Sequence, residues 1–252
     1  MSESNSITLS VVVPCYNEAA RVGRTLDDML ANLPKIVGDS FEIIAVDDGS
    51  SDSTAEVIEA LRIRAAAPIS VVRHAANRGK GAAIRTGVGK SSGKFVLMAD
   101  ADGSTPIAEA SKLLAEGVAG ADIVIGSRAT GDESVLLKTK IHRKLLGRIF
   151  NGAVNFLVLP GIRDTQCGFK LFSRRLIAEI FPKLCVDHFG FDIEVLFMAR
   201  RSGFAIKEVA VDWAHVHGSK VNLVTDSAKM LLMVLRIAVT HSVIARALTG
   251  RS

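Results

Sequence analysis

Cysteine is scarce in this sequence, and its spacing argues against both a disulfide framework and a zinc site. The three cysteines, Cys15, Cys167 and Cys185, lie far apart, and no Cys-x-x-Cys pair occurs. An odd, scattered set of this kind is typical of free thiols in a reducing compartment. His215 and His217 are separated by one residue, but no third ligand stands in register with them, so we do not expect zinc there.

Aromatic residues and long apolar runs are also scarce. Phe, Trp and Tyr make up 5% of the 252 residues, whereas all hydrophobic residues make up 48%, which argues against disorder and against stacking on nucleobases. No uncharged run approaches the roughly 20 residues of a membrane-spanning helix, and residues 1–8 are polar, unlike a secretory signal. We expect a globular chain with no integral anchor and no nucleic-acid partner.

Two glycine-rich phosphate-binding patterns are missing. No Gly-x-Gly-x-x-Gly follows the first apolar run, and no Gly-x-x-x-x-Gly-Lys-Ser/Thr occurs anywhere. Their absence disfavours a dinucleotide-binding Rossmann fold and a phosphate-binding P-loop. The formal net charge of +5 nevertheless suits an anionic partner, so a nucleotide would need another way of neutralising its phosphates.

Apolar runs alternate with segments of helical periodicity through the first half of the chain. The runs begin near residues 10, 41, 69, 95 and 123, and helices are expected between them, for example over residues 80–88 and 107–117. We expect the first strand to stop at Pro14, and the first helix to be capped by Asn17 and to end at Pro34. The alternation predicts an α/β fold with a doubly wound, mostly parallel sheet.

The fourth apolar run ends in two carboxylates, Asp100 and Asp102. Acids at these positions of an extended segment point the same way and repel each other unless a cation lies beside them. Hard oxygen ligands with open coordination positions suit Mg²⁺ or Mn²⁺ that is also held by substrate phosphates. A solvated, aspartate-rich turn is the alternative interpretation.

Four loops follow four strands of the predicted sheet: residues 14–18, 47–50, 100–102 and 126–128. In a doubly wound sheet the carboxyl ends of such strands meet at one crevice. We therefore expect acids, an asparagine and Arg128 to line a common pocket. A metal at Asp102 would neutralise a pyrophosphate there, while another acid would bind base or ribose.

These loops carry the motifs Pro-Cys-Tyr-Asn-Glu, Asp-Asp-Gly-Ser-Ser-Asp, Asn-Arg-Gly-Lys-Gly, Asp-Ala-Asp-Gly-Ser and Gly-Ser-Arg, which resemble those of glycosyltransferase family 2. The family consists of inverting enzymes with a nucleotide-sugar donor and a GT-A fold. Asp-Thr-Gln-Cys-Gly-Phe-Lys, at residues 164–170, is similar to dolichyl-phosphate β-glucosyltransferases and their bacterial polyprenyl-phosphate relatives.

The resemblance implies one GT-A domain over residues 1–225. Its Rossmann-like nucleotide-binding half would span about residues 7–128, and its acceptor-binding half about residues 129–225. An apolar helix over residues 226–252 would contact a membrane or a second copy in a homodimer. A basic amphipathic segment at residues 138–148 would add peripheral contact with anionic lipid on the cytosolic face of a membrane.

The resemblance also implies a role for each motif residue. The implied nucleotide-sugar-binding residues are Pro14, Tyr16, Asn17, Glu18, Asp47, Asp48, Arg78, Lys80, Asp100, Ala101 and Asp102. The implied metal ligands are Asp102, Asp100 and, more weakly, Ser104, which stands where related mannosyltransferases carry Gln. The implied acceptor-phosphate ligands are Arg128, Arg143 and Arg163, whose planar guanidinium groups suit that task. Asp102, Arg128 and Asp164 are the implied catalytic residues.

The activity implied is transfer of glucose from UDP-glucose to a polyprenyl or dolichyl phosphate. The phosphate oxygens are already nucleophilic near neutral pH and need no strong base. Asp164 is then an orienting group or a base, with Asp192 as a second candidate; alternatively, Asp164 ties its loop to Arg163 or Lys170. Two other functions stay open: a GDP-mannose-dependent mannosyltransferase, and a catalytically silent nucleotide-binding module recruited to membranes.

Overall fold

The computed structural model describes residues 7–65, 68–128, 159, 161–188, 190–214 and 240. Seven strands form one sheet in the order β3-β2-β1-β4-β6-β5-β7. The strands are β1 (Leu9–Cys15), β2 (Phe41–Asp47), β3 (Ile69–Arg73), β4 (Phe95–Ala99), β5 (Ile123–Ser127), β6 (Phe169–Ser173) and β7 (Ile206–Ala210).

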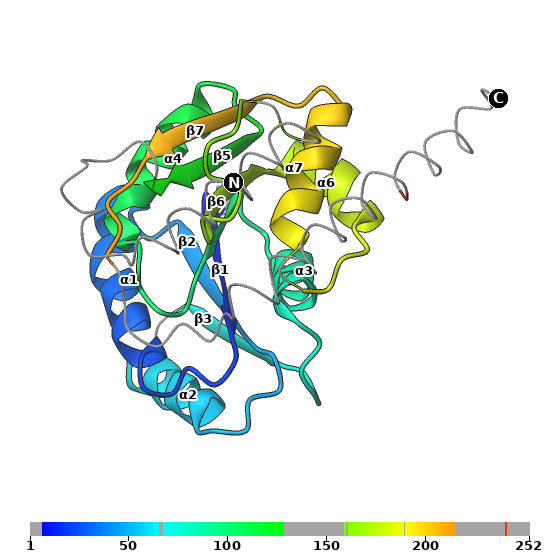
Figure 1. Cartoon of the computed structure of the whole chain (residues 1–252). Helices are drawn as coiled ribbons and strands as arrows, with labels where there is room; N and C mark the ends of the chain where they lie inside the picture. The colour runs from blue at the N-terminus through cyan, green and yellow to red at the C-terminus, as the bar shows by residue number, and fades with distance from the viewer. Residues whose placement is uncertain are drawn as a thin grey trace, which may run out of the picture.

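Helices cover both faces of this sheet. Figure 1 shows α1, α2 and α4 on one side of it and α3, α6 and α7 on the other. Their bounds are α1 (Val22–Val37), α2 (Thr54–Ala65), α3 (Lys80–Lys90), α4 (Ala110–Val118), α6 (Arg174–Ile180) and α7 (Phe191–Arg201), with short 3₁₀ turns η1 (Ile107–Glu109) and η4 (Phe181–Lys183). This is the α/β, mostly parallel architecture that the alternating pattern predicts.

Strand β6 is the exception to the parallel order. It runs antiparallel to both of its neighbours, β4 and β5, and the alternating pattern did not predict it. Because its direction is reversed, β6 enters the sheet at the edge where the parallel strands end. The loop that precedes it, residues 161–168, is thereby brought to the carboxyl ends of β1, β2, β4 and β5.

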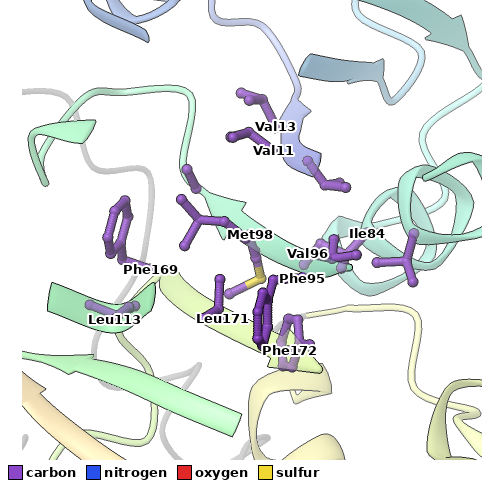
Figure 2. Close-up of a cluster of buried hydrophobic side chains, with 14 of the residues drawn as sticks. Val11, Val13, Ile84, Phe95, Val96, Met98, Leu113, Phe169, Leu171 and Phe172 are labelled. Atoms are coloured by element: carbon purple, nitrogen blue, oxygen red, sulfur yellow. The ribbon is translucent and has the colours of Figure 1, made fainter. Parts of the chain in front are cut away.

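Strand β4 is the middle strand of the sheet, and its five residues are all buried. Figure 2 shows Met98 among side chains from β1 and β6, with Ile84 of α3 and Leu113 of α4 nearby in the same cluster. A strand covered on both faces needs apolar residues at successive positions rather than at alternate ones. The continuous apolar run that ends at Asp100 therefore reflects a central place in the sheet.

Both prolines expected to end an element lie inside one. Strand β1 continues through Pro14 to Cys15; its register with β4 ends at Val12, so the missing N–H of Pro14 removes no bond from that ladder. Helix α1 contains Pro34 and runs to Val37, with the last turn closed by a bond from Gly38 N–H to the Pro34 carbonyl.

Several predicted segments lie outside the described residues. They are the basic segment at residues 138–148 with its Arg143, the two histidines at positions 215 and 217, and the apolar segment at residues 226–252 apart from residue 240. Within the part of the chain that the structure describes, no helix combines the length and apolarity needed to cross a bilayer.

Candidate active site

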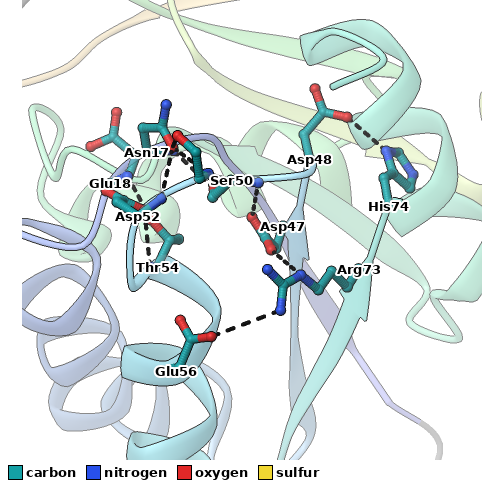
Figure 3. Close-up of polar contacts among 11 residues, drawn as sticks. Asn17, Glu18, Asp47, Asp48, Ser50, Asp52, Thr54, Glu56, Arg73 and His74 are labelled. Carbon is teal, nitrogen blue, oxygen red and sulfur yellow. Dashed lines mark hydrogen bonds and ion pairs between the residues drawn. The ribbon is translucent and has the colours of Figure 1, made fainter. Parts of the chain in front are cut away.

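The loops after β1 and β2 are fastened to each other at the carboxyl edge of the sheet (Figure 3). Asn17 has a positive φ of 55°; its N–H donates to Ser50 Oγ at 2.9 Å and its Oδ1 accepts from Ser51 N–H at 2.8 Å. Glu18 N–H donates to Thr54 Oγ1 at 2.8 Å. Asn17 thus holds two loops together and does not cap α1, which begins at Val22.

The side chains that flank Asn17 differ in how open they are. Tyr16 is 43% exposed at the rim of the edge, so its ring is accessible to a ligand. The carboxylate of Glu18 is bound by Arg21 through Nε at 2.6 Å and Nη2 at 2.5 Å. A ligand that binds Glu18 would therefore share its carboxylate with Arg21.

Asp48 is buried, and hydrogen-bond donors surround its carboxylate. Oδ1 lies 2.7 Å from His74 Nδ1 and accepts from Arg78 N–H at 2.9 Å. Oδ2 accepts from Gly79 N–H at 2.8 Å and from Asn77 Nδ2 at 3.0 Å. With these partners, Asp48 positions the loop at residues 77–79 and the start of α3, and presents no open carboxylate to a nucleoside.

Asp47 is also buried, and its two oxygens differ. Oδ1 accepts from Ser50 N–H at 3.0 Å. Oδ2 forms an ion pair with Arg73 Nε at 3.0 Å but makes no hydrogen bond (Figure 3). Asp47 is fully buried, so its oxygens, like those of Asp48, act within the protein and hold this edge together.

The first acid of the Asp-x-Asp pair already has a cationic partner. Lys80, the first residue of α3, places its Nζ 2.7 Å from Asp100 Oδ1. Burial would lower the pKa of Lys80, but the nearby carboxylates of Asp100 and Asp192 outweigh it and raise the pKa above its ordinary value. The ammonium is therefore charged in the site at neutral pH.

Asp100 is also packed tightly against the loop that precedes β6. Its N–H donates to the Gly168 carbonyl at 3.1 Å, and a Cβ at Gly168 would overlap the Asp100 carboxylate. Only glycine leaves room at this position. The two halves of the chain thus meet at Asp100.

The second acid, Asp102, lacks the lysine partner that Asp100 has. It is partly exposed, and its Oδ1 accepts from Ser104 N–H at 2.9 Å. The backbone around it is fixed from both sides, because Thr25 Oγ1 donates to the Ala101 carbonyl at 2.8 Å and Ala214 N–H donates to the Ser104 carbonyl at 2.9 Å. Asp102 is held in a rigid loop and makes no ion pair with any described residue.

The donor set at this loop fits Mg²⁺ or Mn²⁺ shared with a substrate. Among the described residues no three His, Cys, Asp or Glu side chains gather into an all-protein metal site. Magnesium commonly binds through one or two carboxylates together with substrate phosphates and water. Asp102, with Asp100 and Ser104 beside it, has that composition.

Arg128 and Asp164 form a forked ion pair on the opposite side of the reversed strand. Arg128 Nε and Nη2 donate to the Asp164 carboxylate at 2.7 and 2.9 Å, and Arg128 N–H donates to it at 3.1 Å. Asp164 is tied to Arg128, not to Arg163 or Lys170 as the structural alternative supposed. The Trp213 ring lies 5.6 Å from Arg128 Cζ and covers the guanidinium.

Burial and pairing act in opposite directions on this ion pair. Burial alone would raise the pKa of Asp164, but the hydrogen bonds from Arg128 hold it below its ordinary value. Asp164 is therefore a poor base and a strong orienting group. Arg163 is linked to the same loop, since its N–H and that of Asp164 both donate to the Glu208 carboxylate.

A fully buried lysine, named above only as a possible partner of Asp164, is paired with Asp192 instead. Lys170, on β6, donates from Nζ to Asp192 Oδ1 at 2.5 Å and to the Cys167 carbonyl at 2.6 Å. Asp192 is thus paired within the protein, which disfavours a role as a second base. A lysine inside the apolar run of residues 169–172 was the signal in the sequence.

A seven-stranded, mostly parallel sheet with one reversed strand, and an Asp-x-Asp loop at the shared edge, is the arrangement of the GT-A fold. A model of the family described as Glycosyl transferase family 2 matches residues 10–181. The chain belongs to this family.

Two curated relatives with the same name are similar to this chain over most of its length. The chain is 38% identical over 243 residues to a dolichyl-phosphate β-glucosyltransferase of Dictyostelium discoideum, covering 92% of this chain and 74% of the relative. It is 39% identical over 230 residues to the protein of the same name in Homo sapiens, covering 87% and 71%.

Solved structures show the same fold. Glucosyl-3-phosphoglycerate synthase of Mycobacterium tuberculosis, in complex with Mn²⁺, UDP and phosphoglyceric acid, matches with a TM-score of 0.63 at 22% identity, over 93% of this chain and 78% of that one. Mannosyl-3-phosphoglycerate synthase of Rubrobacter xylanophilus matches with a TM-score of 0.66 at 20% identity, over 98% and 76%.

Proposed function

We propose that this glycosyltransferase moves glucose from UDP-glucose to a dolichyl-type polyprenyl phosphate, with inversion at the sugar. The observation that carries the proposal is the pair of groups at one edge of the sheet: a partly exposed carboxylate, Asp102, and an oriented guanidinium, Arg128. The names of the curated relatives support the same donor sugar and acceptor.

On the donor side, Asp102 would hold Mg²⁺ or Mn²⁺ together with the donor phosphates, with Asp100 and Ser104 adjacent. The bound ion would stabilise the charge that develops on the departing diphosphate. The Mn²⁺ and UDP in a solved structure of the same fold support this proposal. Tyr16, exposed at the rim, would contact the nucleoside.

On the acceptor side, Arg128 would bind the lipid phosphate. Asp164 occupies its Nε and Nη2, which leaves Nη1 for an incoming oxygen. A phosphate monoester has a second pKa of about 6, so its oxygens can attack the sugar without a general base. Asp164 would then act by holding Arg128 in place, and Arg163 and Arg143 would add positive charge.

The donor and acceptor are tested together by a transfer assay. Purified protein is incubated with a short polyprenyl phosphate, Mn²⁺ or Mg²⁺, and either labelled UDP-glucose or labelled GDP-mannose, and the lipid product is identified by mass. We expect glucosyl polyprenyl phosphate to form from UDP-glucose only. Product from GDP-mannose alone would overturn the proposed donor.

The role of Asp102 is tested by Asp102→Ala, which should abolish turnover while leaving the fold intact. Asp27→Ala provides the matched control, because Asp27 is an exposed acid on α1 that pairs with Arg64. Full activity in Asp102→Ala would contradict the proposed donor site.

We also propose that the protein works at the cytosolic face of a membrane as a peripheral enzyme. The net charge of +5 supports attraction to anionic lipid. Flotation with anionic and neutral liposomes tests it: binding should need anionic lipid and weaken with salt. Equal binding to both liposomes at every salt concentration would contradict it.

A further inference from the structure

Lys80 already pairs with one of the two carboxylate oxygens of Asp100, whose side chain is 40% exposed. Its Nζ lies 2.7 Å from Asp100 Oδ1, and its side chain is only 18% exposed. The ammonium enters from the first residue of α3, and the loop before that residue is fixed by Asp48 through Gly79 N–H. Lys80 is therefore held at Asp100 by the fold.

The other oxygen of Asp100 is also confined. A Cβ at Gly168 would overlap this carboxylate, Oδ2 most closely, so the Gly168 backbone covers that side. Asp100 would therefore have to leave both Lys80 and the Gly168 backbone to turn wholly toward a second cation. An ion bound to Asp100 would also lie close to the ammonium, and like charges at that range repel strongly in a partly buried site.

We propose that Lys80 and the divalent ion compete for the carboxylate of Asp100, and that the donor diphosphate relieves this competition, so that ion and nucleotide bind cooperatively. This inference rests on the proposed function, because it concerns the same donor site. Without nucleotide, Asp102 alone would hold the ion, and binding would be weak. With nucleotide, the diphosphate would lie between the two cations and screen each from the other.

The coupling must work in both directions. If a nucleotide tightens the binding of the ion by some factor, the ion tightens the nucleotide by the same factor. Lys80 sets the size of that factor, because it is the resident cation that the free ion has to displace. Removing Lys80 should therefore help the ion when it binds alone and reduce the benefit of adding nucleotide.

Mn²⁺ binding, followed by the loss of the free-ion signal in electron paramagnetic resonance, tests this without any turnover. The full chain is titrated with Mn²⁺ in the absence and presence of UDP. We expect UDP to tighten Mn²⁺ binding to the unsubstituted protein. Lys80→Met should tighten Mn²⁺ alone by about tenfold, within the range typical of coupled sites, and should shrink the effect of UDP.

Lys112→Met is the matched control. Lys112 also pairs with an acid, since its Nζ lies 2.7 Å from Glu109 Oε2, but this pair is not part of the Asp-x-Asp loop. It should leave Mn²⁺ binding unchanged. Thermal melting of each variant checks that it folds. Mn²⁺ affinity that is unchanged or weaker in Lys80→Met would overturn the proposal.

Asp100→Asn gives a second, independent test. While Lys80 is present, this substitution should change the affinity for Mn²⁺ alone by less than about twofold, because Lys80 already excludes the ion from Asp100. In the Lys80→Met background it should weaken the affinity about tenfold. Equal effects in both backgrounds would count against competition. A protein that binds no Mn²⁺ even with UDP would contradict the proposed function itself, which separates the two failures.

Discussion

Arg128 and Asp164 are joined by two side-chain bonds and one backbone bond across 36 positions of sequence. The fork fixes the plane of the guanidinium, and Trp213 covers it. An arginine fixed in this way is pre-organised to bind a phosphate with its remaining nitrogen. Asp164 thereby orients Arg128.

Asp164→Asn should therefore weaken acceptor binding more than donor binding. Asn keeps the shape but cannot accept from both guanidinium nitrogens, so Arg128 loses its orientation. We expect kcat/KM for the polyprenyl phosphate to fall about 10- to 100-fold, with little change in the KM for the nucleotide sugar. Steady-state kinetics with each substrate varied in turn checks this, with the exposed Glu179→Gln as control. A change confined to the donor KM would contradict it.

The same pair should contribute to acid stability. The pKa of Asp164 lies below its ordinary value in the folded protein, so the stabilisation is complete above the unfolded value of about 3.9. It is lost as pH falls through the lower native pKa. Urea unfolding at a series of acidic pH values should show this loss in the unsubstituted protein and a smaller loss in Asp164→Asn. Parallel pH profiles for the two proteins would disprove the assignment.

Gly168→Ala should disrupt the donor site by steric overlap. The added methyl would collide with the Asp100 carboxylate, so either Asp100 or the loop must move. We expect a loss of about 100-fold in turnover. Gly89→Ala, also a glycine-to-alanine change, serves as control because a Cβ there meets open space in α3; it should be neutral or slightly stabilising. Full activity in Gly168→Ala would show that this close contact is unimportant.

Lys170→Met should destabilise the fold, because it leaves Asp192 charged and buried without its partner. Breaking a buried ion pair on one side costs about 3–5 kcal/mol. The double variant Lys170→Met with Asp192→Leu removes both charges and should regain most of that loss. Chemical denaturation gives the free energy of unfolding of the unsubstituted protein, the single variant and the double variant. The exposed pair of Arg62 and Glu59 is the control, and Arg62→Met should leave the midpoint unchanged.

Only Cys185 should react in the folded protein. Cys15 and Cys167 are buried, whereas Cys185 is exposed. Burial, reinforced by Asp164, raises the pKa of the Cys167 thiol to about 11, so almost no thiolate forms at neutral pH. Brief treatment with iodoacetamide followed by peptide mass spectrometry should find one labelled site, and all three after denaturation. Labelling of Cys167 in the folded protein would show that the turn at residues 164–168 opens.

The sequence predicted the part of the fold that local patterns encode. Continuous apolar runs between turn residues indicate buried parallel strands, and these were found where the pattern placed them. The reversed strand was not predicted, because its five residues include a buried lysine whose partner, Asp192, lies on a helix further along the chain. Pro14 did not end its strand because its place in the ladder, unknown from sequence, leaves it no bond to lose.

The site was predicted as a set of loops but not as a set of contacts. The topology rule brings the strand ends together whatever the side chains do. It does not say that Asp48 is enclosed by donors or that Lys80 reaches Asp100. Nor does it say that Asp164 pairs with Arg128. Those pairings depend on distances of a few ångströms between segments far apart in the chain, and spacing in sequence carries no such information.

The reversed strand also bears on how the protein is made. Until the ribosome has released residues 169–173, β4 has an unpaired edge on one side, and that edge belongs to an entirely apolar segment. Exposed apolar edges pair readily with other chains. A nascent polypeptide that stops after residue 127 would therefore be prone to aggregate, and the second half of the chain protects the first during synthesis as well as completing its chemistry.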